Sequence, residues 1–249
     1  MLLYSIMELN ELRAMIKGRY DTFFTDLSID PTTGIIEGSN KRFNGYPYIG
    51  ANYCNAPVKV LFIALDCGED ELAKQNTFRS FESRESIFGG EKLSVNNPHI
   101  AGLYSTALYL LKDSMGWEPA WEKLWSKNRF TMLRAIKKVQ NDLPKNLMSY
   151  VAYFNRYSFV TVGRKKRVGG EDRCWIQPEK EKELIFDIAC LFEPDIIVFQ
   201  GTQGIDNCSV RRLKDKFKVY KMYHPSCWQR RANKLQYVVT TINKLEYNQ

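Results

Sequence analysis

The sequence has only two histidines, His99 and His224, and none of the paired cysteines that build common metal sites. Its six cysteines stand apart, and no two of them form a C-x-x-C pair. This spacing argues against a zinc ribbon or a local iron–sulfur clip. We therefore expect free thiols, a cytoplasmic location, and a site that uses neither a metal nor any other cofactor.

Long apolar runs and targeting signals are also missing. No stretch approaches the roughly 20 apolar residues that a membrane-spanning helix needs. Residues 1–8 lack the basic start and the small-residue cleavage site of a secretory signal. The sequence contains neither a G-x-G-x-x-G nor a Walker pattern, so the usual phosphate-binding loops of nucleotide enzymes are not expected. These absences predict a protein that does not associate with membranes.

The 249 residues are enough for one large α/β domain, and 44% of them are hydrophobic. Internal repeats, low-complexity tracts and Pro/Gly-rich linkers are absent, so we expect a single domain over residues 1–249. Residues 1–56 combine an amphipathic helix with a segment rich in Gly, Pro and Asn, and they are predicted to be a helical and irregular N-terminal extension.

Apolar, β-branched and aromatic runs alternate with amphipathic stretches after this extension. The amphipathic stretches predict helices near residues 8–24, 100–115, 130–140, 178–192 and 208–216. The apolar runs predict strands near residues 58–65, 150–160, 195–200 and 217–222. This alternation favours a three-layer α/β/α sandwich with a central, mostly parallel sheet of about four strands.

Two of the predicted strands end in side chains that can do chemistry. The strand at 58–65 runs into Asp66-Cys67-Gly68, and the strand at 217–222 runs into Tyr223-His224-Pro225-Ser226. Open α/β sheets bind ligands at the carboxyl edge of their strands. Taken alone, the second motif is most simply a turn with an incidental histidine. Together the two motifs predict an acid and an imidazole at the same edge.

The charge of the chain favours an anionic partner. The formal net charge is +8, and the segment 211–234 holds nine basic residues and one acid. A second cluster is formed by Arg164, Lys165, Lys166 and Arg167. Basic clusters beside predicted strand ends are the electrostatic footprint expected for a phosphate backbone. A solvated charged face is an equally good explanation for residues 164–167 alone.

Four positions along the chain, in their order in the sequence, resemble motifs of the uracil-DNA glycosylase superfamily. The resemblance covers about residues 45–240. The four positions are Asp66 in the stretch Ala64–Gly68, Phe78 twelve residues later, Asn155 in a predicted strand, and the motif His224-Pro225-Ser226. The resemblance implies an α/β/α fold of that superfamily, a DNA partner and a monomer. It also implies hydrolysis of the bond between the sugar and uracil, or a related deaminated base, after the base is flipped out of the helix.

The resemblance also assigns roles to residues. Asp66 activates water, His224 stabilises the departing base, Phe78 stacks on that base and Asn155 reads its edge. Gly68 and Ser226 belong to the base pocket. The DNA contacts are expected from Arg164, Lys165, Lys166, Arg167, Trp228, Arg230 and Arg231, of which Trp228 or Arg230 fills the space left in the duplex.

Departures from the family pattern leave two alternatives open. Cys67 stands where the family usually has proline, and Gly68 stands where classical members have tyrosine. One alternative is therefore a member of the superfamily that binds nucleic acid without cleaving it. The other is a thiol enzyme in which His224 activates Cys67.

Overall fold

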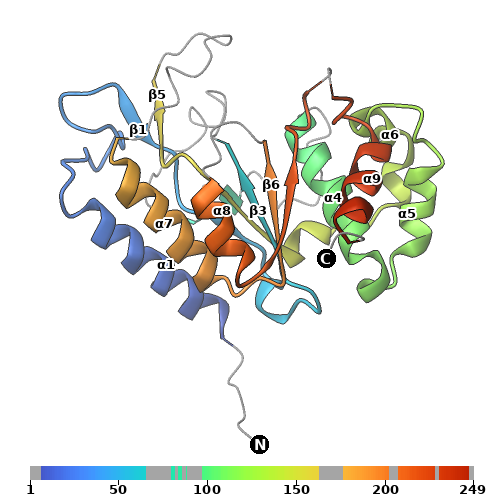
Figure 1. Ribbon diagram of the computed structural model, residues 1–249, viewed down its shortest axis with the longest axis horizontal. Helices are drawn as coiled ribbons and strands as arrows, with labels where there is room; N and C mark the ends of the chain where they lie inside the picture. The colour runs from blue at the N-terminus through green and yellow to red at the C-terminus, as the bar shows by residue number, and fades with distance from the viewer. Residues whose placement is uncertain are drawn as a thin grey trace, which may run out of the picture.

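The computed structural model describes residues 7–65, 80–81, 84–85, 88, 97–162, 176–201, 207–227 and 230–246. A five-stranded sheet forms its centre, in the order β2-β4-β3-β6-β7 (Figure 1). The strands are β2 (Tyr48–Ile49), β3 (Val60–Ala64), β4 (Val151–Asn155), β6 (Ile196–Gln200) and β7 (Lys218–Met222). All neighbours pair in parallel except β2, which runs antiparallel to β4.

The burial of the strands follows from their sequences. β3, β4 and β6 are buried at every position and are almost entirely apolar, as expected of parallel strands covered on both faces. β7 lies at the edge of the sheet, and its Lys218 and Lys221 are only partly buried. Lysines on an edge strand discourage pairing with another chain.

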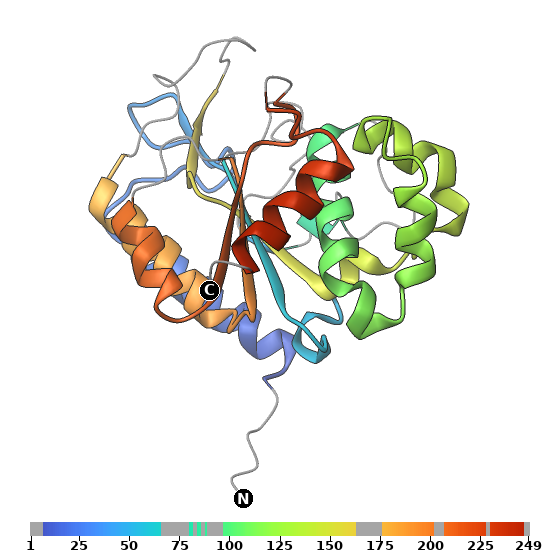
Figure 2. The same ribbon diagram turned by 45° about the vertical axis from the view of Figure 1, so that its right-hand side comes forward.

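Helices cover both faces of the sheet (Figures 1 and 2). One face packs against α4 (Pro98–Met115), α5 (Glu118–Trp125), α6 (Met132–Val139) and α9 (Leu235–Glu246), whose apolar residues share one core cluster. The other face packs against α1 (Leu9–Phe24), α7 (Pro178–Leu191) and α8 (Asn207–Lys214), which share a second cluster. The predicted α/β class and mostly parallel central sheet are confirmed, with five strands in place of about four.

The segment predicted as an N-terminal extension contributes to one helical layer and to the central sheet. α1 packs against α7, and β2 adds the antiparallel edge strand. The predicted strand at 150–160 is divided, because β4 ends at Asn155 and Phe159–Thr161 form β5. β5 pairs with β1 (Lys41–Phe43) in a separate antiparallel ribbon. Short 3₁₀ turns complete the described elements at Tyr53–Asn55, Gln140–Asp142 and Leu147–Tyr150.

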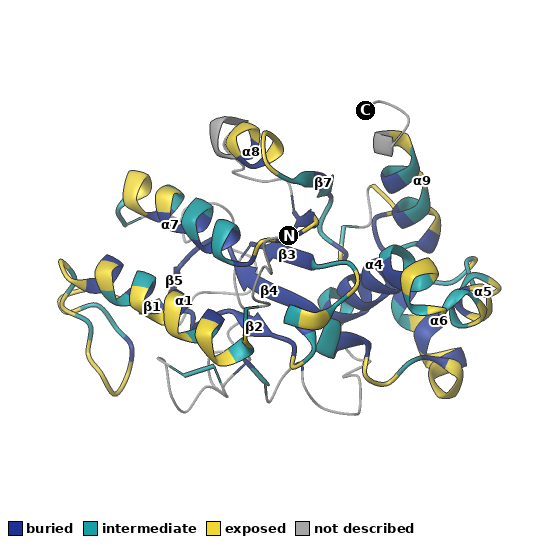
Figure 3. Ribbon diagram, turned by 90° about the horizontal axis from the view of Figure 1, so that it is seen from below, coloured by how far each residue is buried: buried dark blue, intermediate teal, exposed yellow. Residues whose placement is uncertain are grey.

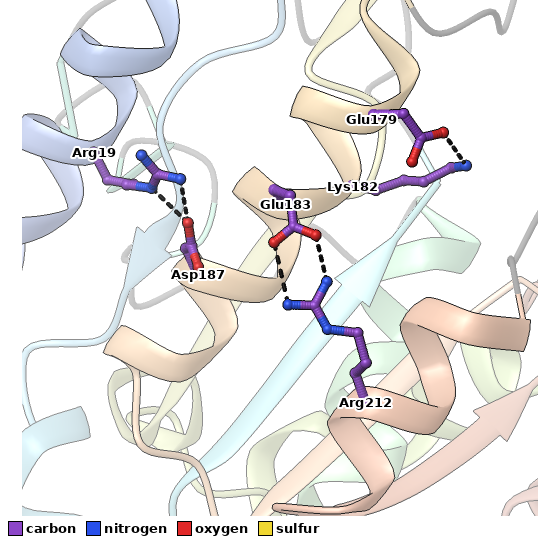
Figure 4. Close-up of polar contacts among 6 residues, drawn as sticks. All are labelled: Arg19, Glu179, Lys182, Glu183, Asp187 and Arg212. Carbon is purple, nitrogen blue, oxygen red and sulfur yellow. Dashed lines mark hydrogen bonds and ion pairs between the residues drawn. The ribbon is translucent and has the colours of Figure 1, made fainter.

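The outer surface of the helical layers is exposed, whereas the central strands are mostly buried (Figure 3). On the α1 side, ion pairs link α7 to its neighbours, Arg19 of α1 with Asp187 and Arg212 of α8 with Glu183, and Lys182 pairs with Glu179 within α7 (Figure 4). Such exposed pairs contribute about 0–1 kcal/mol each. Within the described part of the chain, no helix has the length and apolar character needed to cross a membrane.

Candidate active site

The end of β3, which precedes the first predicted motif in the sequence, lies at the carboxyl edge of the sheet. The Arg156 N–H donates to the Ala64 carbonyl at 2.8 Å, and the Tyr157 N–H donates to the Leu65 carbonyl at 3.0 Å. The backbone as far as Leu65 is therefore held beside β4. Several predicted site residues lie outside the described residues: Asp66, Cys67, Gly68, Phe78, Arg164, Lys165, Lys166, Arg167 and Trp228.

Asn155 is the last residue of β4 and lies opposite Ala64 in the register, whereas the sequence placed it inside a longer strand. It is 5% exposed, so its amide needs hydrogen-bond partners. The Tyr153 hydroxyl donates to Asn155 Oδ1 at 2.7 Å. Residues two apart in a strand share a face, which puts both side chains on the α4 side of the sheet. The tyrosine hydroxyl thus holds one end of the Asn155 amide in place.

The His224-Pro225-Ser226 turn lies two residues beyond β7, close against α4. A Cβ atom added to Gly102 of α4 would lie 2.3 Å from Pro225 Cγ, so this glycine permits the close approach. The Cys227 N–H donates to the His224 carbonyl at 2.8 Å, which closes the turn. The turn and the helix are therefore packed together, and the imidazole of His224 is held at the start of α4.

Both nitrogens of the His224 ring have partners. Ser226 donates its backbone N–H to Nδ1 at 3.3 Å, and its Oγ lies 2.6 Å from the same nitrogen. His224 Nε2 lies 3.0 Å from Nδ1 of His99, and the two rings cross at 81°. No local sequence pattern predicts this contact, because 125 residues separate the two histidines.

A basic cavity of about 750 Å³ is connected to the segment before this turn through Tyr237 of its lining, whose hydroxyl accepts the Tyr223 N–H at 2.7 Å. It is lined by Asn128, Arg129, Arg230, Arg231, Asn233, Lys234, Gln236, Tyr237 and Thr240. Among these described residues four are cationic and none is acidic. Burial raises the pKa of the Tyr237 hydroxyl, so this phenol adds no negative charge at neutral pH. The cavity therefore suits an anionic group.

Backbone contacts hold the cations of the cavity together. The Met132 N–H donates to the Asn233 carbonyl at 2.8 Å, and Lys234 Nζ donates to the Arg129 carbonyl at 2.7 Å. Arg231 has a left-handed φ of 50°, uncommon for a residue other than glycine. Arg230 and Arg231 were predicted from sequence. Arg129 was missed, because it lies between α5 and α6 with no motif around it.

The structure divides the basic segment 211–234. Residues 211–218 precede or begin β7 and so lie toward the amino edge of the sheet, whereas residues 230–234 follow its carboxyl end. A five-residue strand spans about 17 Å. Arg212 is also engaged elsewhere, with Glu183 and over the Phe186 ring. Lys221 and residues 230–234 are the basic part of the segment that lies in or beyond the carboxyl half of β7.

No protein-family model matches the sequence, and no curated protein matches it.

Proposed function

We propose that the protein is a DNA glycosylase with a fold of the uracil-DNA glycosylase superfamily, which removes uracil or a related deaminated base. The observation that carries the proposal is the common location of Asn155 and His224. Asn155 ends β4 and His224 follows β7 by two residues, so both lie at the carboxyl edge of the sheet, on the side covered by α4. The resemblance of the sequence requires these two residues to meet at one base.

The spacing of the strands supports this pairing. β4 and β7 are separated by β3 and β6, which gives three steps of about 4.8 Å, or roughly 14 Å between their axes. Side chains that extend from the two strand ends can therefore contact opposite edges of one nucleobase. An amide both donates to a carbonyl oxygen and accepts from an N–H, which is the pattern on one edge of uracil.

The proposed reaction breaks the bond between the sugar and the base through an oxocarbenium-like sugar. Asp66 orients or deprotonates the attacking water and balances the positive charge on the sugar. The Nε2 hydrogen of His224 stabilises the negative charge on the departing base. Phe78 stacks on the base, and the proposed site uses no metal. The base, once flipped out of the helix, is held between Asn155 and His224.

Replacement of Asn155 by aspartate is expected to reduce excision of uracil and to raise the ratio of cytosine to uracil excision. A carboxyl group presents a different hydrogen-bond pattern to the base. Excision rates on matched oligonucleotides that carry uracil or cytosine measure the ratio. Tyr153→Phe removes the hydroxyl that holds the amide but keeps the amide itself, so it should change the ratio less than Asn155→Asp does. Full activity with an unchanged ratio in Asn155→Asp would show that Asn155 does not read the base.

The basic cavity is proposed to bind backbone phosphates of the DNA beside the flipped base. Arg129→Ala is expected to weaken binding to all sequences and to reduce the slope of log affinity against log salt by about 0.9 per lost phosphate contact. Affinities for one duplex at several salt concentrations measure this slope. Lys214→Ala, an exposed lysine at the end of α8, is the control and should leave the slope unchanged. Equal slopes for both variants would show that the cavity does not contact the DNA phosphates.

The second candidate function is nucleic-acid binding without cleavage. The observation that favours it is the basic cavity. Its four cationic residues can bind phosphates without any catalysis by Asp66. Comparison of binding with the formation of abasic sites separates the two functions. Oligonucleotides with uracil, hypoxanthine, xanthine or mismatched thymine would also identify the base that is removed.

A further inference from the structure

The hydrogen on Nε2 of His224, which the proposed function directs at the base, points at another side chain in the structure. Two groups of Ser226 contact Nδ1 of His224: the backbone N–H at 3.3 Å, which can only donate, and the hydroxyl at 2.6 Å, which can donate to the same nitrogen. The backbone N–H makes Nδ1 an acceptor, which assigns the hydrogen of a neutral His224 ring to Nε2. Nε2 lies 3.0 Å from Nδ1 of His99. A hydrogen bond between two nitrogens needs one hydrogen and one lone pair. His224 is therefore the donor, and His99 is the acceptor.

His99 is held in place by the start of α4. The side chain of Asn97 caps the helix by accepting the His99 N–H at 2.9 Å, and Pro98 occupies the first turn. Three residues further along the same helix, Gly102 packs directly against Pro225. The backbones that carry the two rings are thus fixed relative to each other. The contact is part of the packing between α4 and the turn.

We infer that His99 is the resting acceptor of the His224 N–H, and that a carbonyl oxygen of the base must replace it. This inference rests on the proposed function. The N–H cannot direct a full hydrogen bond to His99 and to the base at once. The protein must therefore give up one imidazole hydrogen bond whenever a base binds, and His99 sets how tightly the base is held.

His99→Ala is expected to lower the inhibition constant of free uracil in an excision assay by about two- to tenfold. That range is the change in affinity that corresponds to the net free energy of one hydrogen bond between neutral groups. His99→Gln keeps a side-chain acceptor and should bring the constant back toward the wild-type value. A purely structural role for His99 would instead raise the constant and lower the turnover rate together. An unchanged or raised constant in a folded His99→Ala protein would overturn the inference.

Nitrogen NMR of the ring signals supplies a readout that does not need activity. The chain has only two histidines, so comparison with His99→Ala assigns both rings. At a pH of about 8, where unperturbed imidazoles are neutral, His224 should carry its hydrogen on Nε2 and share it with His99 Nδ1. Added uracil should remove that sharing. Absence of the shared hydrogen in the free protein would also overturn the inference.

The failures of the two proposals can be told apart. Excision by the wild-type protein with an unchanged constant in His99→Ala overturns the role of His99 and leaves the proposed function in place. Failure of the wild-type protein to form abasic sites overturns the proposed function, and the inference falls with it.

Discussion

Replacement of His224 by alanine is expected to lower base excision by about 10²–10³-fold while the protein stays folded. Removal of one positioned donor to a developing negative charge typically has this effect. Single-turnover excision from a uracil-containing oligonucleotide measures the rate. Because His224 is half-buried and Pro225 carries the contact with Gly102, the substitution should leave the packing of the turn intact.

Ser226→Ala is the matched control for this variant. It removes the exposed hydroxyl but keeps the backbone N–H that fixes the hydrogen on His224 Nε2. Its effect should therefore be much smaller than that of His224→Ala. A His224→Ala protein that excises uracil at nearly the wild-type rate would show that the assigned donor is wrong.

Asp66→Asn is expected to reduce excision by about 10²–10⁴-fold, the usual contribution of a general base. The amide cannot take a proton from water, and it no longer balances the positive sugar. Circular dichroism and DNA affinity show whether the variant remains folded and able to bind. The neighbouring substitution Cys67→Ala is the control, and it should retain activity. Loss of activity in Cys67→Ala together with full activity in Asp66→Asn would favour the thiol enzyme.

Much of the fold could be predicted because most of its central strands are short, continuous apolar segments. The runs that become β3, β6 and β7 were located from hydrophobicity and from the residues that end them. β2 was missed, because a two-residue strand leaves no periodic pattern. The end of β4 was also misplaced. Residues 156–160 are aromatic and β-branched like a strand, although the chain leaves the central sheet after Asn155.

The candidate site was predictable only where strand ends carry it. Asn155 ends one strand and His224 follows another, so the topology of a parallel sheet brings them to one edge. His99 and Arg129 come from the helical layer, and their positions depend on how α4 and the segment before α6 pack. No local pattern encodes such contacts. The basic segment 211–234 likewise reads as continuous in sequence, although β7 separates its two parts.

The formation of abasic sites by the wild-type protein tests the central claim most directly. A labelled oligonucleotide with one uracil is incubated with the purified protein and then treated with alkali, which cleaves the strand at an abasic site. The account predicts cleavage at the uracil position, none in the matched thymine oligonucleotide, and a strong decrease with His224→Ala. Tight binding of the oligonucleotide without any alkali-sensitive site would contradict it.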